Sequence, residues 1–551
     1  MRKTASLDGL DVKAYAGTTG VLLAMNQKDE PEEDFLGFAI ERVVSNGKWE
    51  WLDGFLPFPT MDHQSGQPIP SNIAPIQKFR WSDYTVNPNT QYRYRVHRVA
   101  GDPKRPNIDS GPSITVTTAG SPDAEHRVLF NRAAAASQAF ARKFQTLNQI
   151  LSEPGPKADT PMPSDALVWL SRGLKEAIVS FIERARDDTW ALDIAIYQYE
   201  QKDIVDAVDA AHRRGVNLKV VYHSKLNDDQ TTRNETSLKN IPSSAKRARV
   251  TTRIFHHKFI VLSRIEGGIK KPQAVLCGST NFTHNGIYRQ ANLVHIVVRE
   301  EVAREYTTLF DELFSGNNPS ETKQFIDTNN PIQRGVPLYV GFSPRSKLLD
   351  LQDFVEEIGK AKRDVLFCTT FNLFAGVQDA LLGKPHDAIL RYGIQDKRSK
   401  ITGFHADRTA DFEATAMLSR GLEGFLKESL KGDQGTGPIL IHTKLIVVDF
   451  TSDAPVVISG SHNFSRPASE GNDENFLLIK GDTEVADSYG CELMRLYDHY
   501  RFRFRTEEAR KAGKKPERFT LKTDSTWAKP YFKTGSLKMS DRLFFAGDDL
   551  S

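Results

Sequence analysis

The sequence of 551 residues has few of the features that mark disulfide-rich, metal-binding or membrane-spanning proteins. It has only three cysteines, Cys277, Cys368 and Cys491, and no two are close enough for a CxxC motif, so we predict no disulfide framework. No DxD or HExxH motif and no Cys/His cluster is present, and we therefore expect no metal ion or other cofactor. No run of about 18 apolar residues occurs, which argues against a transmembrane helix.

The sequence also lacks an excess of charge of either sign. It has 73 basic and 70 acidic residues, a formal charge of +3, so any attraction to nucleic acid or to an anionic membrane must be local. The first residues, MRKTASLDGLDVKAYAG, begin with basic side chains but lack the apolar segment of a signal peptide. We expect a soluble, cytoplasmic protein, with export by a route independent of signal peptides left open.

Residues 1–120 have the pattern of an all-β domain. Short segments rich in β-branched and aromatic residues alternate with clusters of Gly, Pro and Asn. We expect strands at Val21–Met25, Phe35–Val44, Lys48–Asp53, Tyr92–Val99 and Ser113–Thr118. The sequence QYRYRVHRVAG alternates apolar side chains with arginines, as a strand with one buried face does. With the NPNT turn before it and GPSITVTT after it, this stretch resembles the last strands of a fibronectin type III or immunoglobulin-like sandwich.

After residue 120 the pattern changes to helices and strands in an order that occurs twice. The first occurrence predicts a helix over 126–145, a helix capped by Ser164 with Leu167, Leu170, Leu174, Ile178 and Ile182 on one face, a strand Ala191–Tyr197, a helix Ile204–Arg213 and a strand Asn217–His223. The second predicts a helix over 346–361, a strand over 364–370, a helix over 376–382 and a strand over 387–392. This order implies parallel strands covered by helices. We therefore predict two α/β halves, 121–330 and 331–551, related by pseudo-two-fold symmetry.

Each half contains a His-x-Lys pair at the start of an apolar strand. IFHHKFIVL at 254–262 contains His256 and Lys258, and IHTKLIVV at 441–448 contains His442 and Lys444. In a strand, residues i and i+2 point to the same face, so each pair should project together. His257 should point to the opposite face, and we expect it to be structural.

A Gly-Ser-x-Asn-Phe sequence follows each His-x-Lys pair. GSTNF at 278–282 contains Ser279 and Asn281, and GSHNF at 460–464 contains Ser461 and Asn463. Coincidence does not explain both motifs occurring twice at similar spacing. His284 and His462, beside these motifs, are expected to be exposed or to lie behind the catalytic groups.

These side chains suit phosphoryl transfer without a metal ion. A lysine supplies a fixed positive charge for a phosphate oxygen, and serine hydroxyls and asparagine amides donate hydrogen bonds. An imidazole can attack phosphorus or protonate a departing oxygen near neutral pH. Two copies brought face to face supply one nucleophile, one general acid and two Lys/Asn pairs around one phosphate. This need for two histidines explains why the motif is repeated.

The paired motifs resemble those of the phospholipase D superfamily, whose signature is HxKxxxxD followed by GSxN. The second half matches in full at His442, Lys444, Asp449, Gly460, Ser461 and Asn463, whereas the first has Ser263 in place of the aspartate. The resemblance covers roughly residues 125–551. It implies two phospholipase D-like α/β halves that share one active site behind an all-β sandwich, a phosphohistidine intermediate, and an aspartate that lies away from the phosphate.

The resemblance further implies an acidic residue after GSxN that orients a catalytic imidazole. NDENFLL supplies Glu474, whereas RQANLVH in the first half offers only Gln290 or Ala291 for this role. If the carboxylate reaches across the interface, His256 is the nucleophile and His442 the acid. The predicted catalytic residues are His256, Lys258, His442, Lys444, Asn281, Asn463 and Glu474, and the predicted substrate-binding residues are Ser279, Ser461, Asn292 and Asn475.

We expect a monomeric enzyme that hydrolyses a phosphodiester. A phospholipid substrate, with peripheral membrane contact, is slightly favoured by the near-neutral charge, the 32 phenylalanines and the two repeats in one chain. The alternative is a metal-independent nuclease acting on DNA or RNA, which GSxNF and the basic stretches at 246–253, 395–400, 501–505 and 510–518 favour. A second alternative is a catalytically inactive binding protein. The aromatic segment at 523–532 should either close over the cleft or cap the core.

Overall fold

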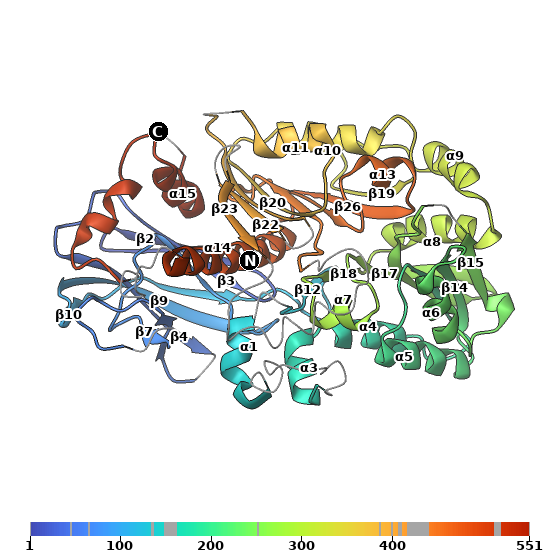
Figure 1. The fold of residues 1–551 in the computed structure, drawn as a ribbon, viewed down its shortest axis with the longest axis horizontal. Helices are drawn as coiled ribbons and strands as arrows, with labels where there is room; N and C mark the ends of the chain where they lie inside the picture. The colour runs from blue at the N-terminus through green and yellow to red at the C-terminus, as the bar shows by residue number, and fades with distance from the viewer. Residues whose placement is uncertain are drawn as a thin grey trace.

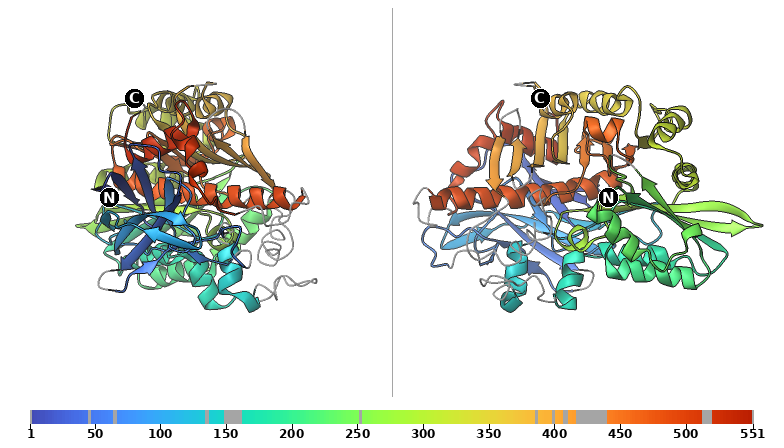
Figure 2. Two further views of the ribbon diagram at one scale, coloured as in Figure 1. Left: turned by 90° about the vertical axis from the view of Figure 1, so that its left-hand side faces the viewer. Right: turned by 45° about the vertical axis from the view of Figure 1, so that its right-hand side comes forward.

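The computed structural model describes residues 2–549 except 45–46, 64–66, 134–136, 148–161, 251–252, 385–386, 398–399, 406–409, 416–439 and 512–519. These residues build an N-terminal β region and two α/β halves (Figure 1). The long helix α14 (Thr483–Lys511) runs between the N-terminal strands and the strands of the second half (Figure 2). None of the helices in the described part of the chain is long and apolar enough to cross a membrane.

The N-terminal region is built from antiparallel strands, as the sequence predicts. One sheet has the order β1 (Arg2–Leu7), β2 (Leu10–Ala16), β3 (Val21–Gln27) and β8 (Arg80–Asp83). A second has β10 (Arg105–Ile108), β9 (Gln91–Asp102), β4 (Phe35–Val44) and β5 (Glu50–Trp51), with β11 (Ser113–Thr117) also paired to β9. The strand expected at 48–53 is divided between β5 and β6 (Asp53–Gly54), and β6 pairs with β7 (Ile69–Pro70). The fibronectin or immunoglobulin type stays a prediction.

The two α/β halves contain mixed sheets whose strand orders correspond. The first sheet has the order β12 (His126–Phe130), β18 (Leu293–Val297), β17 (Ile269–Gly278), β16 (Lys258–Glu266), β13 (Trp190–Ile196), β14 (Asn217–Ser224) and β15 (Lys246–Val250). The second has β19 (Leu338–Ser343), β26 (Glu474–Lys480), β25 (Val456–Gly460), β24 (Leu445–Val448), β20 (Asp364–Thr370), β21 (Leu390–Lys397), β22 (Lys400–His405) and β23 (Ala410–Thr415). Both predicted parallel pairs, β13 with β14 and β20 with β21, are confirmed.

The correspondence ends at the seventh strand. In the first half β15 runs parallel to β14, whereas in the second half β22 runs antiparallel to β21 and is followed by the additional strand β23. The pseudo-symmetric fold class is therefore confirmed for the central strands, and the outer strands distinguish the halves. The domain boundaries at 120 and 330 stay predictions.

Helices cover the sheets at the places that the repeat predicts. The first half has α1 (Ser137–Lys143), α3 (Ser164–Ser171), α4 (Leu174–Glu183), α5 (Lys202–Arg213), α6 (Asp229–Ser237), α7 (His284–Tyr288), α8 (Glu300–Ser315) and α9 (Pro319–Asn329). The second has α10 (Leu349–Gly359), α11 (Ala375–Leu382), α13 (Arg466–Glu470), α14 and α15 (Leu537–Ala546). The segment from 316 to 337, which includes α9, connects the two halves.

The helix predicted over 126–145 is wrong in its first part. Residues 126–130 form β12, which pairs antiparallel with β18, and the helix α1 begins only at Ser137. Val128 and Phe130 are buried while the residues between and before them are partly exposed. This period of two is the pattern of an edge strand, and it takes precedence over the alanine-rich sequence that follows.

The helix predicted from Ser164 is divided into two. Arg172 and Gly173 both have positive φ, so α3 ends and α4 begins there. Pro163, rather than Ser164, occupies the N-cap position, and no side chain caps the helix. The apolar face is present nevertheless: Leu170, Leu174, Ile178 and Ile182 are buried and Leu167 is partly buried.

The aromatic segment at 523–532 caps the core of the N-terminal region. The rings of Trp527 and Phe35 lie 5.4 Å apart, and those of Tyr531 and Phe79 lie 4.9 Å apart. Of the two positions that the sequence allowed for this segment, the structure shows the core cap.

Candidate active site

The two His-x-Lys pairs lie where the halves meet, at the start of the central strands β16 and β24. Each histidine is paired through its backbone with a loop of the opposite half. The amide of His256 donates to the carbonyl of Asp473 at 2.9 Å, and the amide of His442 donates to the carbonyl of Ala291 at 3.0 Å. Isolated parallel β-bridges also join Phe255 to Asp473 and Ile441 to Ala291, so that each half exchanges backbone contacts with the other. Each half therefore positions the other half's histidine.

This exchange brings the two imidazoles together. The ring centroids of His256 and His442 lie 6.1 Å apart with an angle of 76° between the ring planes, and each residue is 5% exposed. Burial, followed by the positive charges of Lys258 and Lys444, holds the pKa of each imidazole well below its usual value. Both rings are consequently neutral in the free protein at neutral pH.

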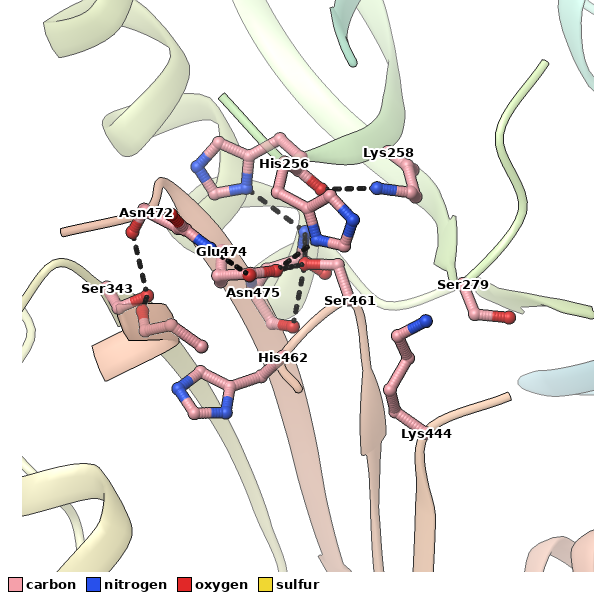
Figure 3. A network of polar contacts seen from close by, with 12 residues as sticks. His256, Lys258, Ser279, Ser343, Lys444, Ser461, His462, Asn472, Glu474 and Asn475 are labelled. Carbon is pink, nitrogen blue, oxygen red and sulfur yellow. Dashed lines mark hydrogen bonds and ion pairs between the residues drawn. The ribbon is translucent and has the colours of Figure 1, made fainter. Parts of the chain in front are cut away.

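A carboxylate from the second half anchors His256. Glu474 Oε2 lies 2.7 Å from His256 Nδ1 (Figure 3). Ser461 Oγ donates to the same oxygen at 2.8 Å, and Asn472 Nδ2 donates to Oε1 at 3.2 Å. The amide of Asn475 donates to Ser461 Oγ at 3.0 Å, which directs the hydroxyl proton toward the carboxylate. Burial raises the pKa of Glu474.

An amide from the first half anchors His442 in the corresponding way. Asn292 Oδ1 and the carbonyl of Ser279 each lie 3.0 Å from His442 Nδ1. Ser279 Oγ donates to Asn292 Oδ1 at 2.8 Å and accepts the amide of Leu293 at 3.2 Å. Asn292 Nδ2 donates to the carbonyl of Gly286 at 3.0 Å, which fixes the amide so that its oxygen faces the imidazole.

The orienting residue of the first half is therefore Asn292, and the sequence expectation of Gln290 or Ala291 is corrected. Asn292 stands 13 positions after Ser279, and Glu474 stands 13 positions after Ser461. Aligning the two halves from their serines, instead of pairing Asn292 with Asn475, identifies the equivalent positions. Asn475 is equivalent to Leu293.

The two anchors select one tautomer for each imidazole. The atoms facing Nδ1 are a carboxylate oxygen at His256 and carbonyl oxygens at His442, all of them hydrogen-bond acceptors. Nδ1 must then carry the proton in both rings, which leaves Nε2 as the basic nitrogen. Each ring thus presents a lone pair on Nε2 when it is neutral, and an Nε2 proton when it is charged.

Two buried lysines supply the positive charge of the site. Lys258 Nζ donates to the carbonyl of His256 at 2.7 Å, and Lys444 Nζ donates to the carbonyl of His442 at 2.6 Å. In Figure 3 both lysines lie to the right of the His256 ring, with Lys258 above and Lys444 below. Burial lowers the pKa of Lys258 well below its usual value and lowers that of Lys444 to about 7. An anion between the lysines would favour the charged form of both.

The two motif asparagines differ in their partners. Asn281 Nδ2 donates to Gln198 Oε1 at 2.5 Å, and Gln198 Nε2 donates to Gln230 at 3.0 Å, so an amide chain leads from the site to α6. Asn281 Oδ1 and Asn463 Oδ1 are buried atoms without a hydrogen-bond partner among the described residues. No signal in the sequence identifies Gln198, because it lies in the loop after β13, far from either motif.

The residues predicted to bind substrate are hydrogen-bonded to other groups of the protein. Ser279, Ser461 and Asn292 hold the orienting groups, as described above. Asn475 Nδ2 lies 3.1 Å from His257 Nδ1, and Tyr306 donates to Asn475 Oδ1 at 3.2 Å. All four residues are buried, and their role in substrate binding stays a prediction.

The other histidines near the motifs lie outside the space between the two rings. His257 is buried with the ring of Phe259 5.3 Å away, and burial lowers the pKa of His257 to about 3, as expected of a structural residue. His462 is buried with its Nε2 3.2 Å from Asp350 Oδ2. His284 is exposed.

The aspartate of the second motif and the serine that replaces it in the first occupy different backbone environments. Asp449 Oδ1 accepts the amides of Lys362 at 2.8 Å and Arg363 at 2.7 Å, and Asp449 itself has φ of 53°, so it fixes the turn after β24. Ser263 lies inside β16, which continues to Glu266. The longer hairpin of the first half accounts for its longer spacing between motifs, and with no turn at Ser263 it needs no aspartate.

Comparisons with known proteins find one family model that matches part of the first half. Residues 178–314 match a family model described as cardiolipin synthase, phospholipase D-like domain. No curated protein matches the sequence significantly. Within the described ranges, no group of three or more His, Cys, Asp or Glu side chains is arranged to hold a metal ion.

Similar solved structures share little sequence with the chain. Phosphatidylserine synthase of Haemophilus influenzae is 13% identical over 68% of this chain and 94% of that one, with a TM-score of 0.41. The phospholipase D family member Nuc of Salmonella typhimurium is 20% identical over 25% of this chain and 84% of its own, with a TM-score of 0.20. Polyphosphate kinase of Porphyromonas gingivalis is 12% identical over 59% of this chain, with a TM-score of 0.37, and the chain spans 50% of its length. The matched family model identifies a phospholipase D-like domain over residues 178–314 of the first half, and the paired motifs resemble those of the phospholipase D superfamily.

Proposed function

We propose that the protein hydrolyses a phosphodiester through a phosphohistidine intermediate. The observation that carries the proposal is the pair of facing imidazoles, each with Nδ1 anchored by an acceptor, so that each presents Nε2 for reaction. One histidine alone would have to be nucleophile and acid at once. Two histidines separate these tasks.

The reaction balances with the groups present. The negative charge of the bound diester raises the pKa of His442, so that this imidazole is protonated when substrate is present. His256 Nε2 attacks phosphorus, and the bond between phosphorus and the leaving oxygen breaks as that oxygen takes the proton from His442 Nε2. Neutral His442 then removes a proton from water, and the water oxygen attacks phosphorus. The phosphorus–nitrogen bond breaks, which releases a phosphomonoester and returns neutral His256 and protonated His442.

The roles of the two histidines follow from the different charges of their anchors. A phosphorylated imidazole with a proton on Nδ1 carries positive charge, and the carboxylate of Glu474 stabilises that charge better than a neutral amide does. His442 has only carbonyl acceptors at Nδ1, which favours release of its Nε2 proton. His256 is therefore the nucleophile and His442 the general acid.

The lysines and motif asparagines bind the phosphate in this proposal. A phosphate between Lys258 and Lys444 pairs with charges that are costly to bury alone, because burial lowers the pKa of both lysines. In this proposal the side-chain amide of Asn463, and the N–H of Asn281 Nδ2 that does not donate to Gln198, contact the remaining oxygens. These contacts strengthen as negative charge grows on the transferred group.

A phospholipid is the favoured substrate, with contact at the membrane surface. Exposed apolar side chains lie near the site: Leu226 is 85% exposed, Val250 is 69% exposed and Ile254 is 37% exposed. Leu226 lies two residues after the end of β14, and Val250 is the last residue of β15. Ile254 precedes His256 by two residues. Apolar side chains at the carboxyl ends of these strands support contact with lipid.

A nuclease acting on DNA or RNA is the second candidate. Exposed Lys225 and Arg253 lie beside the same apolar residues and would suit a phosphate backbone. The basic stretches at 246–253, 395–400 and 510–518 fall partly or wholly outside the described residues. An inactive binding protein is the third candidate, and the intact set of four catalytic His and Lys residues argues against it.

Parallel assays distinguish these functions. Purified protein is incubated, with and without EDTA, with phosphatidylcholine vesicles, with phosphatidylglycerol vesicles and with a plasmid. We expect head-group release that survives EDTA and that is lost in His256→Ala and His442→Ala. Nicking of the plasmid without head-group release would favour the nuclease, and activity that either alanine variant retains in full would contradict the shared site.

A further inference from the structure

A buried ion pair joins the halves next to the nucleophile. Arg249 Nη2 lies 2.9 Å from Asp473 Oδ1, and Arg249 Nε lies 3.2 Å from Asp473 Oδ2, so the contact is bidentate. Both side chains are almost completely buried. Arg249 comes from β15 of the first half and Asp473 from the loop that precedes β26 of the second. Nothing in the two motifs indicates this pair.

The remaining donors of Arg249 hold the segment that connects the halves. Nη1 donates to the carbonyl of Asn317, and Nη2 also donates to Thr322 Oγ1 at 3.1 Å. Asn317 precedes α9 and Thr322 lies in its first turn. One guanidinium therefore fixes the first half, the connection and the second half at one point, a task that suits its rigid planar fork.

Asp473 is also the residue whose backbone pairs with the strand of His256. Its amide donates to the carbonyl of Ile254 at 3.1 Å, and its carbonyl accepts the amide of His256 at 2.9 Å. The next residue is Glu474, whose carboxylate anchors the His256 ring. The ion pair thus acts on the backbone that carries the imidazole and on the loop that carries its carboxylate.

Among the described residues, no ion pair equivalent to Arg249–Asp473 lies beside the second histidine. Ala291 occupies the position equivalent to Asp473, and an alanine side chain cannot form an ion pair. The strand equivalent to β15 is β22, which runs in the opposite direction along its neighbour. The ion pair therefore belongs to the Glu474–His256 side alone.

We propose that Arg249 is a positioning residue that, through Asp473, holds Glu474 against His256 Nδ1 and so makes His256 the nucleophile. This inference rests on the proposed phosphodiesterase function. Arg249 touches neither substrate nor the reacting atoms. Its effect is on geometry, and a displacement of about 1 Å in a catalytic group costs on the order of a hundredfold in rate.

The test uses variants that avoid leaving an unpaired buried charge. Arg249→Met/Asp473→Asn removes both charges, and Arg249→Lys keeps the charge but loses the bidentate contact. The matched control is Arg2→Met/Asp487→Asn, which removes another largely buried pair, joined at 2.8 Å between β1 and α14. Thermal unfolding confirms that each variant is folded before its kinetics are measured.

Hydrolysis of bis(p-nitrophenyl) phosphate is then followed against pH. In the Arg249/Asp473 double variant we expect kcat to fall at least about tenfold, with KM changing less than about threefold, because orientation rather than binding is lost. The acid limb of the kcat/KM profile should move to lower pH, since His256 loses carboxylate contact and its pKa falls. Arg249→Lys should lie between the wild type and the double variant.

The control separates this inference from a general loss of stability. Arg2→Met/Asp487→Asn should keep kcat and the pH profile of the wild type, even where its melting temperature falls as far as that of the double variant. Wild-type kcat and an unmoved acid limb in folded Arg249→Met/Asp473→Asn would overturn the inference. The proposed function would survive that result, and it would fail separately if His256→Ala hydrolysed the same diester at the wild-type rate.

Discussion

In the first half of the molecule His256 contacts a carboxylate, whereas in the second half His442 contacts an amide. The motifs that hold these rings correspond: a serine follows each His-x-Lys strand, and the orienting residue follows that serine by 13 positions. The halves thus share the framework that brings two imidazoles together. They differ in the charge of the orienting side chain and in the Arg249–Asp473 ion pair, and the proposed mechanism assigns the nucleophile and the acid from these differences.

Removal of the histidines should have the largest effect and should separate their roles. His256→Ala loses the nucleophile, so we expect a loss of activity of at least about 10⁴-fold on any diester. His442→Ala loses the acid, which matters less when the leaving group is already a weak base. With bis(p-nitrophenyl) phosphate, His442→Ala should therefore release one equivalent of nitrophenolate in a burst, and His256→Ala should release none. A burst from His256→Ala alone would reverse the assignment.

Exchange of the orienting groups should have the next largest effect. Glu474→Gln makes the first site resemble the second, and we expect kcat to fall by about 10³–10⁴-fold because His256 loses its carboxylate. Asn292→Asp places a second carboxylate beside His442, which should raise the pKa of His442 and move the basic limb of the kcat profile to higher pH. Equal losses in Glu474→Gln and the matched variant Asn292→Ala would show that the two anchors do not differ.

Much of this arrangement can be predicted from the sequence, because its signals are local and repeated. The His-x-Lys and GSxN motifs, the strand periodicity and the β-α-β order all occur within short stretches, and they identify His256 and His442, whereas Glu474 is implied by the resemblance to the phospholipase D superfamily. The orienting role of Asn292 is missed when Asn292 is aligned with Asn475 rather than with Glu474. Arg249 and Gln198 cannot be found in this way, since their partners Asp473 and Asn281 are 224 and 83 residues away in sequence.

The buried lysines should give the free protein a pH-dependent stability. The pKa of Lys444 is lowered to about 7 by burial, below its value in the unfolded chain, so the unfolded state binds more protons between about pH 7 and 10.5. Stability contributed by this group should therefore rise with pH across that range and should level off below pH 7. Melting temperatures of the wild type and Lys444→Met, measured from pH 6 to pH 10, should converge toward high pH.

Inorganic phosphate provides the control for that measurement. A bound anion favours protonated Lys444, so phosphate should raise the melting temperature of the wild type most at or below pH 7 and should have little effect on Lys444→Met. A phosphate effect that grows with pH would contradict the placement of the anion between the lysines.

The smallest effect on catalysis is expected at the motif aspartate. Asp449→Ala leaves the amides of Lys362 and Arg363 without their acceptor, so we expect a loss of about 1–3 kcal/mol in unfolding free energy. The kcat of the folded protein should stay within about twofold of the wild type, because the aspartate has no contact with either histidine. Ser263→Asp should not raise kcat, and a gain of activity there would show that the missing aspartate limits the first half.

The most direct test of the account is to identify the phosphorylated residue. The protein is mixed with bis(p-nitrophenyl) phosphate, quenched in alkali to preserve phosphohistidine, digested and examined by mass spectrometry. The account predicts the nitrophenyl phosphate adduct on the peptide that contains His256, with the largest yield in His442→Ala. An adduct on His442 in the otherwise wild-type protein would contradict the assignment of the nucleophile to the histidine held by Glu474.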